Sequence, residues 1–124
     1  MLDKVISAIH DALSFALKEP RARGLDLESA EATAAHERLL REKPFLRSLY
    51  THYYAEFARA HRNAPDGLRV ELGSGAGFLD ETIPGLVRLD IRKGARVDIV
   101  ASALAMPFSS GSVGALFMLN VLHH

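Results

Sequence analysis

Three glycines at alternate positions, Gly73, Gly75 and Gly77, directly follow an apolar run at 68–72. A short apolar run that ends in glycines is typical of a strand buried on both faces of a parallel sheet. Because glycine has no Cβ, the backbone can turn tightly at these positions and can approach a ligand closely. The segment therefore predicts a strand, a tight turn and a helix whose first amides face the turn.

Two known glycine patterns do not fit this segment. The dinucleotide fingerprint requires Gly-x-Gly-x-x-Gly or Ala, and counting from Gly73 places Phe78 at its last position. The phosphate-binding loop requires a lysine after its last glycine, and Phe78 follows Gly77. What remains is Glu-x-Gly-x-Gly-x-Gly at 71–77, for which a tight turn without a ligand is the alternative interpretation.

Short apolar runs alternate with glycine-bearing connections after the turn-forming segment at 63–67. Runs at 68–72, 86–91, 97–100 and 113–121 predict four buried strands, and their continuous apolar character favours a parallel sheet of the α/β class. The connection from the first to the second strand is just long enough for a short helical crossover. Pro84 should end that helix.

The N-terminal half of the chain is predicted to be helical. Apolar residues recur in steps of three and four at 2–17, and helices are also expected at 27–41 and 45–60. Pro44 suits the first turn of the last of these helices. Its tyrosines are expected to pack in the core with their hydroxyl groups near solvent, and contact with a substrate is the alternative. We expect an N-terminal helical region at 1–64 and a ligand-binding region at 65–124.

The carboxylate of Asp90 closes the second predicted strand. Parallel α/β sheets bind ligands beyond the carboxyl ends of their strands, so Asp90 should lie beside the glycine segment. A carboxylate at this place can accept hydrogen bonds from both hydroxyls of a ribose. Taken alone, Asp90 would be interpreted as a surface acid, and its position after a glycine segment favours the ligand role.

Composition excludes several classes of function. Fifteen basic residues balance fifteen acidic ones, which argues against general nucleic-acid binding. The chain has no cysteine, which excludes disulfides, thiolate zinc sites and a cysteine nucleophile, and which suits a cytoplasmic location. No apolar stretch approaches the roughly 20 residues of a membrane-spanning helix, so no membrane span is predicted.

Residues 68–124 resemble the class I S-adenosylmethionine-dependent methyltransferases, and in particular the type 11 methyltransferase family. The resemblance rests on VELGSGAG at 70–77, LD at 89–90, AMPF at 105–108 and MLNVLHH at 118–124. It implies a Rossmann-like methyltransferase fold that binds S-adenosylmethionine, transfers a methyl group to an unidentified acceptor and releases S-adenosylhomocysteine. No metal is implied. A binding module without catalytic activity is the alternative, and Phe78 disfavours a nucleotide-dependent oxidoreductase.

The resemblance also implies the roles of individual residues. Glu71 would face the ammonium group of the cofactor, Asp90 would hold the ribose hydroxyls, and Ile91 would pack on the adenine. His123 and His124 are the nearest candidates for a base, but a structural or solvent-facing role is favoured and no catalytic residue is assigned. The complete set of expected cofactor-binding residues is Glu71, Gly73, Ser74, Gly75, Gly77, Asp90, Ile91, Ser102, Ala103 and Asn120.

The chain departs from the family pattern at two positions and at its C-terminal end. Ser102 and Gly114 stand where the family often has acids, which weakens one adenine contact and puts local rigidity in doubt. The family's sheet has more strands than the four predicted here, so we expect the chain to be truncated after the fourth strand. An apolar edge would then be exposed, and a homodimer formed along this edge is an alternative to a fragment of a longer chain.

Overall fold

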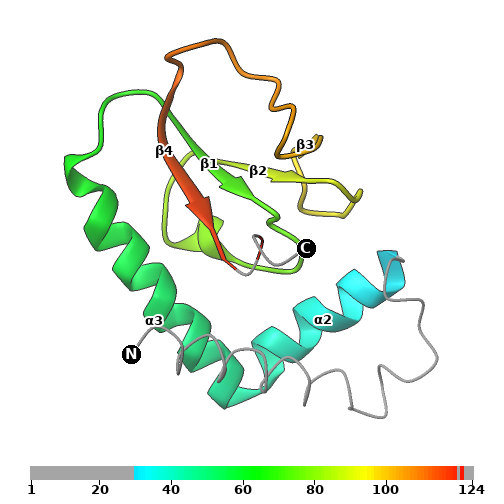
Figure 1. Ribbon diagram of the computed structural model, residues 1–124. Coiled ribbons are helices and arrows are strands. Elements are labelled where there is room, and N and C mark those ends of the chain that lie inside the picture. Colours follow the sequence, from blue (N-terminus) through cyan, green and yellow to red (C-terminus); the bar gives the residue numbers. More distant parts are fainter. Residues whose placement is uncertain (1–29, 120, 122–124) are drawn as a thin grey trace.

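The computed structural model describes residues 30–119 and 121, which form helices followed by a parallel sheet (Figure 1). The predicted helix at 2–17 lies outside the described residues. The elements, in chain order, are α2 (Ala30–Glu42), α3 (Pro44–Ala60), the 3-10 helix η2 (His61–Asn63), β1 (Leu68–Leu72), the 3-10 helix η3 (Leu79–Glu81), β2 (Leu86–Asp90), β3 (Ile99–Val100) and β4 (Val113–Met118).

The four strands pair in the order β3-β2-β1-β4, and all of the pairs are parallel. This arrangement confirms the predicted α/β class and the parallel sheet. β3 is shorter than the predicted run at 97–100, because the side chain of Asp98, in place of a backbone carbonyl, accepts the amide of Arg88. Its Oδ2 accepts the amide of Arg88 at 2.8 Å, and its own amide donates to the carbonyl of Arg88 at 2.8 Å.

The helix α3 begins as its sequence predicts. Pro44 occupies the first helical turn after an extended Lys43, where the missing amide hydrogen of proline costs nothing. Residues four apart share one face of a helix, so Leu46, Tyr50 and Tyr54 form a buried stripe along α3. In residues 30–119, neither α-helix combines the length and the apolar character that a membrane crossing would need.

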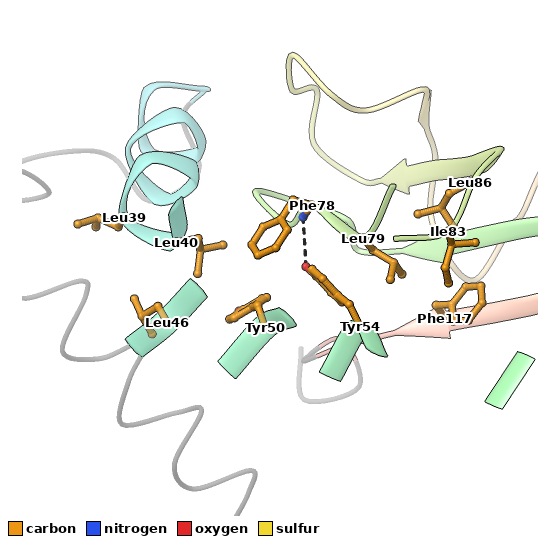
Figure 2. Packing of buried hydrophobic residues seen from close by; sticks show 10 residues of the cluster. All are labelled: Leu39, Leu40, Leu46, Tyr50, Tyr54, Phe78, Leu79, Ile83, Leu86 and Phe117. Carbon is orange, nitrogen blue, oxygen red and sulfur yellow. Dashed lines mark hydrogen bonds between the residues drawn. The ribbon is translucent and has the colours of Figure 1, made fainter. Parts of the chain in front are cut away.

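Apolar side chains cover the sheet on both faces, because successive residues of a strand point to opposite sides. One face of the sheet packs against the helices. The core cluster between them has ten buried residues, which Figure 2 shows: Leu39, Leu40, Leu46, Tyr50, Tyr54, Phe78, Leu79, Ile83, Leu86 and Phe117. On the other face Val70, Leu72 and Leu89 form a second cluster, to which the segment after β3 contributes Ala101 and Phe108. The first cluster joins residues from both sides of the predicted boundary at 64.

Gly114 marks an irregularity between β1 and β4. Leu68 pairs with Val113 but Arg69 pairs with Ala115, so Gly114 is passed over in the register. A Cβ at Gly114 would collide with the carbonyl oxygen of Pro65 and would lie 2.5 Å from Nη1 of Arg69. The guanidinium of Arg69 donates to the carbonyls of Pro65 and Gly67 at 2.9 Å. A glycine is therefore required where the preceding turn passes over β4.

Candidate functional site

The glycine loop, defined as residues 73–77, leaves the carboxyl end of β1 and lies beneath the helices. Gly73 and Gly75 adopt φ angles of 63° and 43°, in the left-handed region that side chains disfavour. Gly77 is required for a different reason, because a Cβ there would lie 2.6 Å from Oη of Tyr54 and 3.1 Å from the carbonyl oxygen of Ser74. Gly73 and Gly75 are thus required by the conformation of the backbone, and Gly77 is required by the close approach of Tyr54.

Three contacts fasten the glycine loop to the neighbouring strand β2. The amide of Ser74 donates to the carbonyl of Leu89 at 3.1 Å, and the amide of Gly75 donates to Oδ2 of Asp90 at 2.8 Å. Nη2 of Arg88 donates to the carbonyl of Gly77 at 2.7 Å. The loop is therefore held at its start, middle and end by consecutive residues of β2.

A cleft of about 100 Å³, part of it open to solvent, lies over the glycine loop. Its walls come from α2, α3, the end of β1, the glycine loop and the residue after β4. The lining residues are His36, Leu40, Tyr50, Tyr54, Glu71, Gly73, Ser74, Gly75, Ala76, Gly77 and Leu119.

A buried ion pair underlies this cleft. Glu71 and Arg88 are 4% and 2% exposed, and Oε2 of Glu71 lies 3.7 Å from Nε of Arg88, beyond hydrogen-bonding distance. Burial raises the pKa of Glu71 to about 7, against the attraction of the Arg88 guanidinium, and the nearby Asp80 carboxylate raises the pKa further. Glu71 therefore changes its charge near neutral pH, at the floor of the cleft.

Aromatic side chains connect α3 to the end of the glycine loop (Figure 2). The hydroxyl of Tyr54 accepts the amide of Phe78 at 3.2 Å, and the two rings meet edge to face with centroids 4.9 Å apart. The ring of Tyr50 lies edge to face with that of Tyr54 at 5.8 Å. Burial, more than any other influence, raises the pKa of Tyr54, so its hydroxyl stays protonated. Phe78, which ended the dinucleotide pattern, is a core residue.

Charged side chains dock α2 against the segments that follow β1 and β2. Arg96 contacts Glu37 of α2 at 3.1 Å and Asp80 of η3 at 2.6 Å, and Arg41 of α2 contacts Glu81 of η3 at 2.7 Å. These pairs are half-buried, so water screens them only in part. They fix the face that α2 presents to the cleft.

The residues predicted from the sequence fall into three groups. Glu71, Gly73, Ser74, Gly75 and Gly77 all line the cleft. Asp90 touches its floor through Gly75, whereas Ile91, Ser102 and Ala103 lie outside the lining, beyond the ends of β2 and β3. Ile91 is 69% exposed, and the hydroxyl of Ser102 accepts the amide of Leu104 at 3.1 Å. Asn120 lies outside the described residues.

Sequence reasoning did not assign the helical wall of the cleft or the arginine beneath it. Nothing in the sequence around His36 and Leu40 of α2 indicated that they line a cleft. The local pattern predicts a helix but does not show which distant segment the helix packs against. The tyrosines of α3 were noticed as a cluster, and Tyr50 and Tyr54 serve both as core and as cleft wall. Arg88 had a usable signal, since it is a charged residue within an apolar run.

No known protein-family model matches the chain, and comparisons with curated proteins and with solved structures found no significant match.

Proposed function

We propose that this chain binds S-adenosylmethionine in the cleft over the glycine loop, as part of a Rossmann-like methyltransferase that acts on an unidentified acceptor. The observation that carries the proposal is the contact between Gly75 and Asp90. It places a glycine-lined backbone and the terminal carboxylate of the next strand side by side, and Glu71 lies within the same cleft. A ligand with an ammonium group at one end and a ribose at the other matches this arrangement of acceptors.

The polar atoms of the cleft fit the proposed cofactor. Within the described part of the chain, Oε2 of Glu71 and Oγ of Ser74 are buried without a hydrogen-bond partner, and both are able to accept from an ammonium group. The two oxygens of Asp90 accept the amides of Gly75 and Arg92, and each oxygen keeps a second acceptor site for a ribose hydroxyl. Ile91 offers an exposed apolar surface to an adenine. When bound, the sulfonium would supply an electrophilic methyl group.

A dinucleotide fits the site less well. Dinucleotide sites place a pyrophosphate on the free amides of a helix that follows the glycine turn. Here the three-residue η3 follows, with the acids Asp80 and Glu81 in its only turn. The amide of Phe78 already donates to Tyr54. A pyrophosphate would therefore meet one three-residue turn and an amide that is already satisfied.

Calorimetric titration with S-adenosylhomocysteine and, separately, with NAD tests the proposal. We expect saturable binding of the first ligand and none of the second. Asp90→Ala should weaken S-adenosylhomocysteine binding by about 1.5–3 kcal/mol, the range for hydrogen bonds to a charged group. Asp90→Asn should weaken it less, because the amide oxygen still accepts from Gly75. Asp66→Asn, in an exposed turn, is the matched control.

Two outcomes of the titration count against the proposal. Binding of NAD alone would contradict the cofactor assignment, and unchanged affinity in both Asp90 variants would contradict the role of that carboxylate. Methyl transfer from labelled S-adenosylmethionine, followed on the same protein, separates an enzyme from a module that only binds the cofactor.

A further inference from the structure

His36 is a titratable side chain of the cleft that has no part in the proposed binding of the cofactor. His36 belongs to α2 and lines the cleft together with Leu40, one helical turn further on. Residues four apart lie on the same face of a helix, so the two side chains stand one above the other over the glycine loop. The imidazole is thus the polar group that α2 contributes to an otherwise apolar wall.

The imidazole nitrogen Nε2 of His36 is buried and has no hydrogen-bond partner among residues 30–119 and 121. Buried polar atoms in folded proteins nearly always find a partner, so an unpaired one in a cleft points to a bound group that supplies the missing interaction. Burial lowers the pKa of His36 below 6.5, so the imidazole is neutral at physiological pH. A neutral imidazole offers a lone pair that can accept a proton.

The docking of α2 holds this imidazole in place. Glu37, the next residue in the helix, is tied to Arg96, and Arg41 is tied to Glu81. Leu39 and Leu40 are buried in the core on the helical side of the sheet. A base on a helix that is held by packing and ion pairs loses little orientation when a substrate binds.

We propose that His36 is the general base that accepts the proton of a hydroxyl group on the methyl acceptor, an inference that rests on the proposed methyltransferase function. The hydroxyl oxygen gives its proton to Nε2 and forms a bond to the methyl carbon. The carbon–sulfur bond breaks, and its electron pair stays on sulfur. The products are a methyl ether, a neutral thioether and an imidazolium that releases its proton to solvent.

The lining of the cleft narrows the class of acceptor. A neutral amine is nucleophilic without help, whereas a hydroxyl group is a poor nucleophile until it loses its proton, so an unpaired base suits a hydroxyl. The remaining wall consists of the apolar Leu40 and Leu119 and the rings of Tyr50 and Tyr54. These surfaces favour a flat apolar body beside the reactive group. The acceptor class is therefore a phenol-like hydroxyl compound.

The other titratable groups of the cleft are poorer bases for this step. Glu71 of β1 faces the buried Arg88 guanidinium and lies at the glycine loop, where the cofactor's ammonium group is expected. Tyr54 of α3 already accepts the amide of Phe78, and its raised pKa keeps its proton in place. Tyr50 of α3 packs in the core, with its ring edge to face against that of Tyr54. Among residues 30–119, Nε2 of His36 is therefore the unpartnered cleft atom that the proposed cofactor leaves available.

The test uses the 124-residue chain loaded with S-adenosylhomocysteine and para-nitrophenol as the probe. The nitrophenolate ion absorbs visible light and the neutral phenol does not, so absorbance at a fixed pH reports where the proton lies. Binding to the loaded protein should raise the ratio of ionised to neutral probe about tenfold, equal to one pKa unit. His36→Gln should abolish the rise and keep the affinity for S-adenosylhomocysteine. His52→Gln, on the exposed face of α3, is the control and should keep the rise.

A second measurement is independent of any substitution. The carbon-13 resonance of the His36 imidazole in the loaded wild-type protein should move to its protonated position when the probe binds. The inference is overturned if the probe fails to bind, if it ionises equally in His36→Gln, or if the imidazole stays neutral. Failure of the wild-type protein to bind S-adenosylhomocysteine would instead refute the proposed function, and the two failures are thereby distinguished.

Discussion

Replacing Gly77 by alanine should destabilise the protein through one identifiable contact. The added Cβ would lie 2.6 Å from Oη of Tyr54, a separation that real Cβ atoms do not tolerate. Tyr54 has little room to move, because its side chain is 1% exposed and its hydroxyl accepts the amide of Phe78. The backbone at Gly77 does not have a positive φ angle, so alanine meets no conformational strain of its own.

The size of the effect follows from these contacts. Overpacking of a rigid core costs about 1–3 kcal/mol, and the lower chain entropy of alanine in the unfolded state returns about 0.4–1 kcal/mol. Tyr54→Phe alone should cost about 1–2 kcal/mol, because the buried amide of Phe78 loses its acceptor. Once the hydroxyl is gone, the alanine no longer collides with it. Gly77→Ala should therefore destabilise the Tyr54→Phe variant by about 1–2 kcal/mol less than it destabilises the wild-type protein. This difference is the coupling energy of the pair.

Urea denaturation of the wild-type protein, the two single variants and the double variant measures this coupling. Gly85→Ala is a control for glycine replacement, because no atom of the described residues lies within 4 Å of a Cβ there and only its φ of 73° is strained. We expect Gly85→Ala to show no coupling to Tyr54→Phe. If the free energies of unfolding for Gly77→Ala and Tyr54→Phe simply add, the contact does not explain the glycine and the reasoning fails.

Three further predictions concern the same region. Arg88→Met should lower the free energy of unfolding by about 3–5 kcal/mol, since it strands a buried acid, and adding Glu71→Gln should recover part of the loss in the same urea assay. The pKa of Glu71 rises from 4.5 to about 7 on folding, so its contribution to stability is complete below pH 4.5 and is lost as the pH rises through 7. Stability measured across that window should fall by about 3 kcal/mol more in the wild-type protein than in Glu71→Gln, and parallel curves would exclude the shift. Gly114→Ala should cost about 1–3 kcal/mol in thermal unfolding through its collision with Pro65, and an unchanged Tm would show that the turn can move aside.

Local chemistry in the sequence was enough to predict the sheet and the glycine loop. Apolar runs set the strands, and the positive φ angles at Gly73 and Gly75 follow from the need for a tight turn after β1. Asp90 was correctly expected beside this loop, because strand ends of a parallel sheet meet at one edge. These features depend on neighbours in the chain or on the regular geometry of a sheet, so the pattern predicts them.

The helical wall of the cleft depends on contacts between residues far apart in the chain. Arg96 reaches Glu37 across 59 positions, and nothing in the local pattern of either segment specifies that pairing. The position of His36 in the cleft depends on this docking of α2, so the periodicity of the sequence could not predict it. The shorter β3 has a similar origin, because Asp98 takes up the backbone amide of Arg88 with its side chain. Strand propensity does not predict a side chain that takes the place of a backbone group in the hydrogen bonds of a sheet.

The fastening of the glycine loop to β2 decides which part of the site is able to move. Leu89, Asp90 and Arg88 hold three successive points of the loop, so the floor of the cleft keeps its shape whether or not a ligand is present. Ligands that enter a prearranged floor spend little conformational entropy on it. Any adjustment of the site to a ligand is then expected in the helical wall, where the ion pairs of Arg41 and Arg96 are only half-buried.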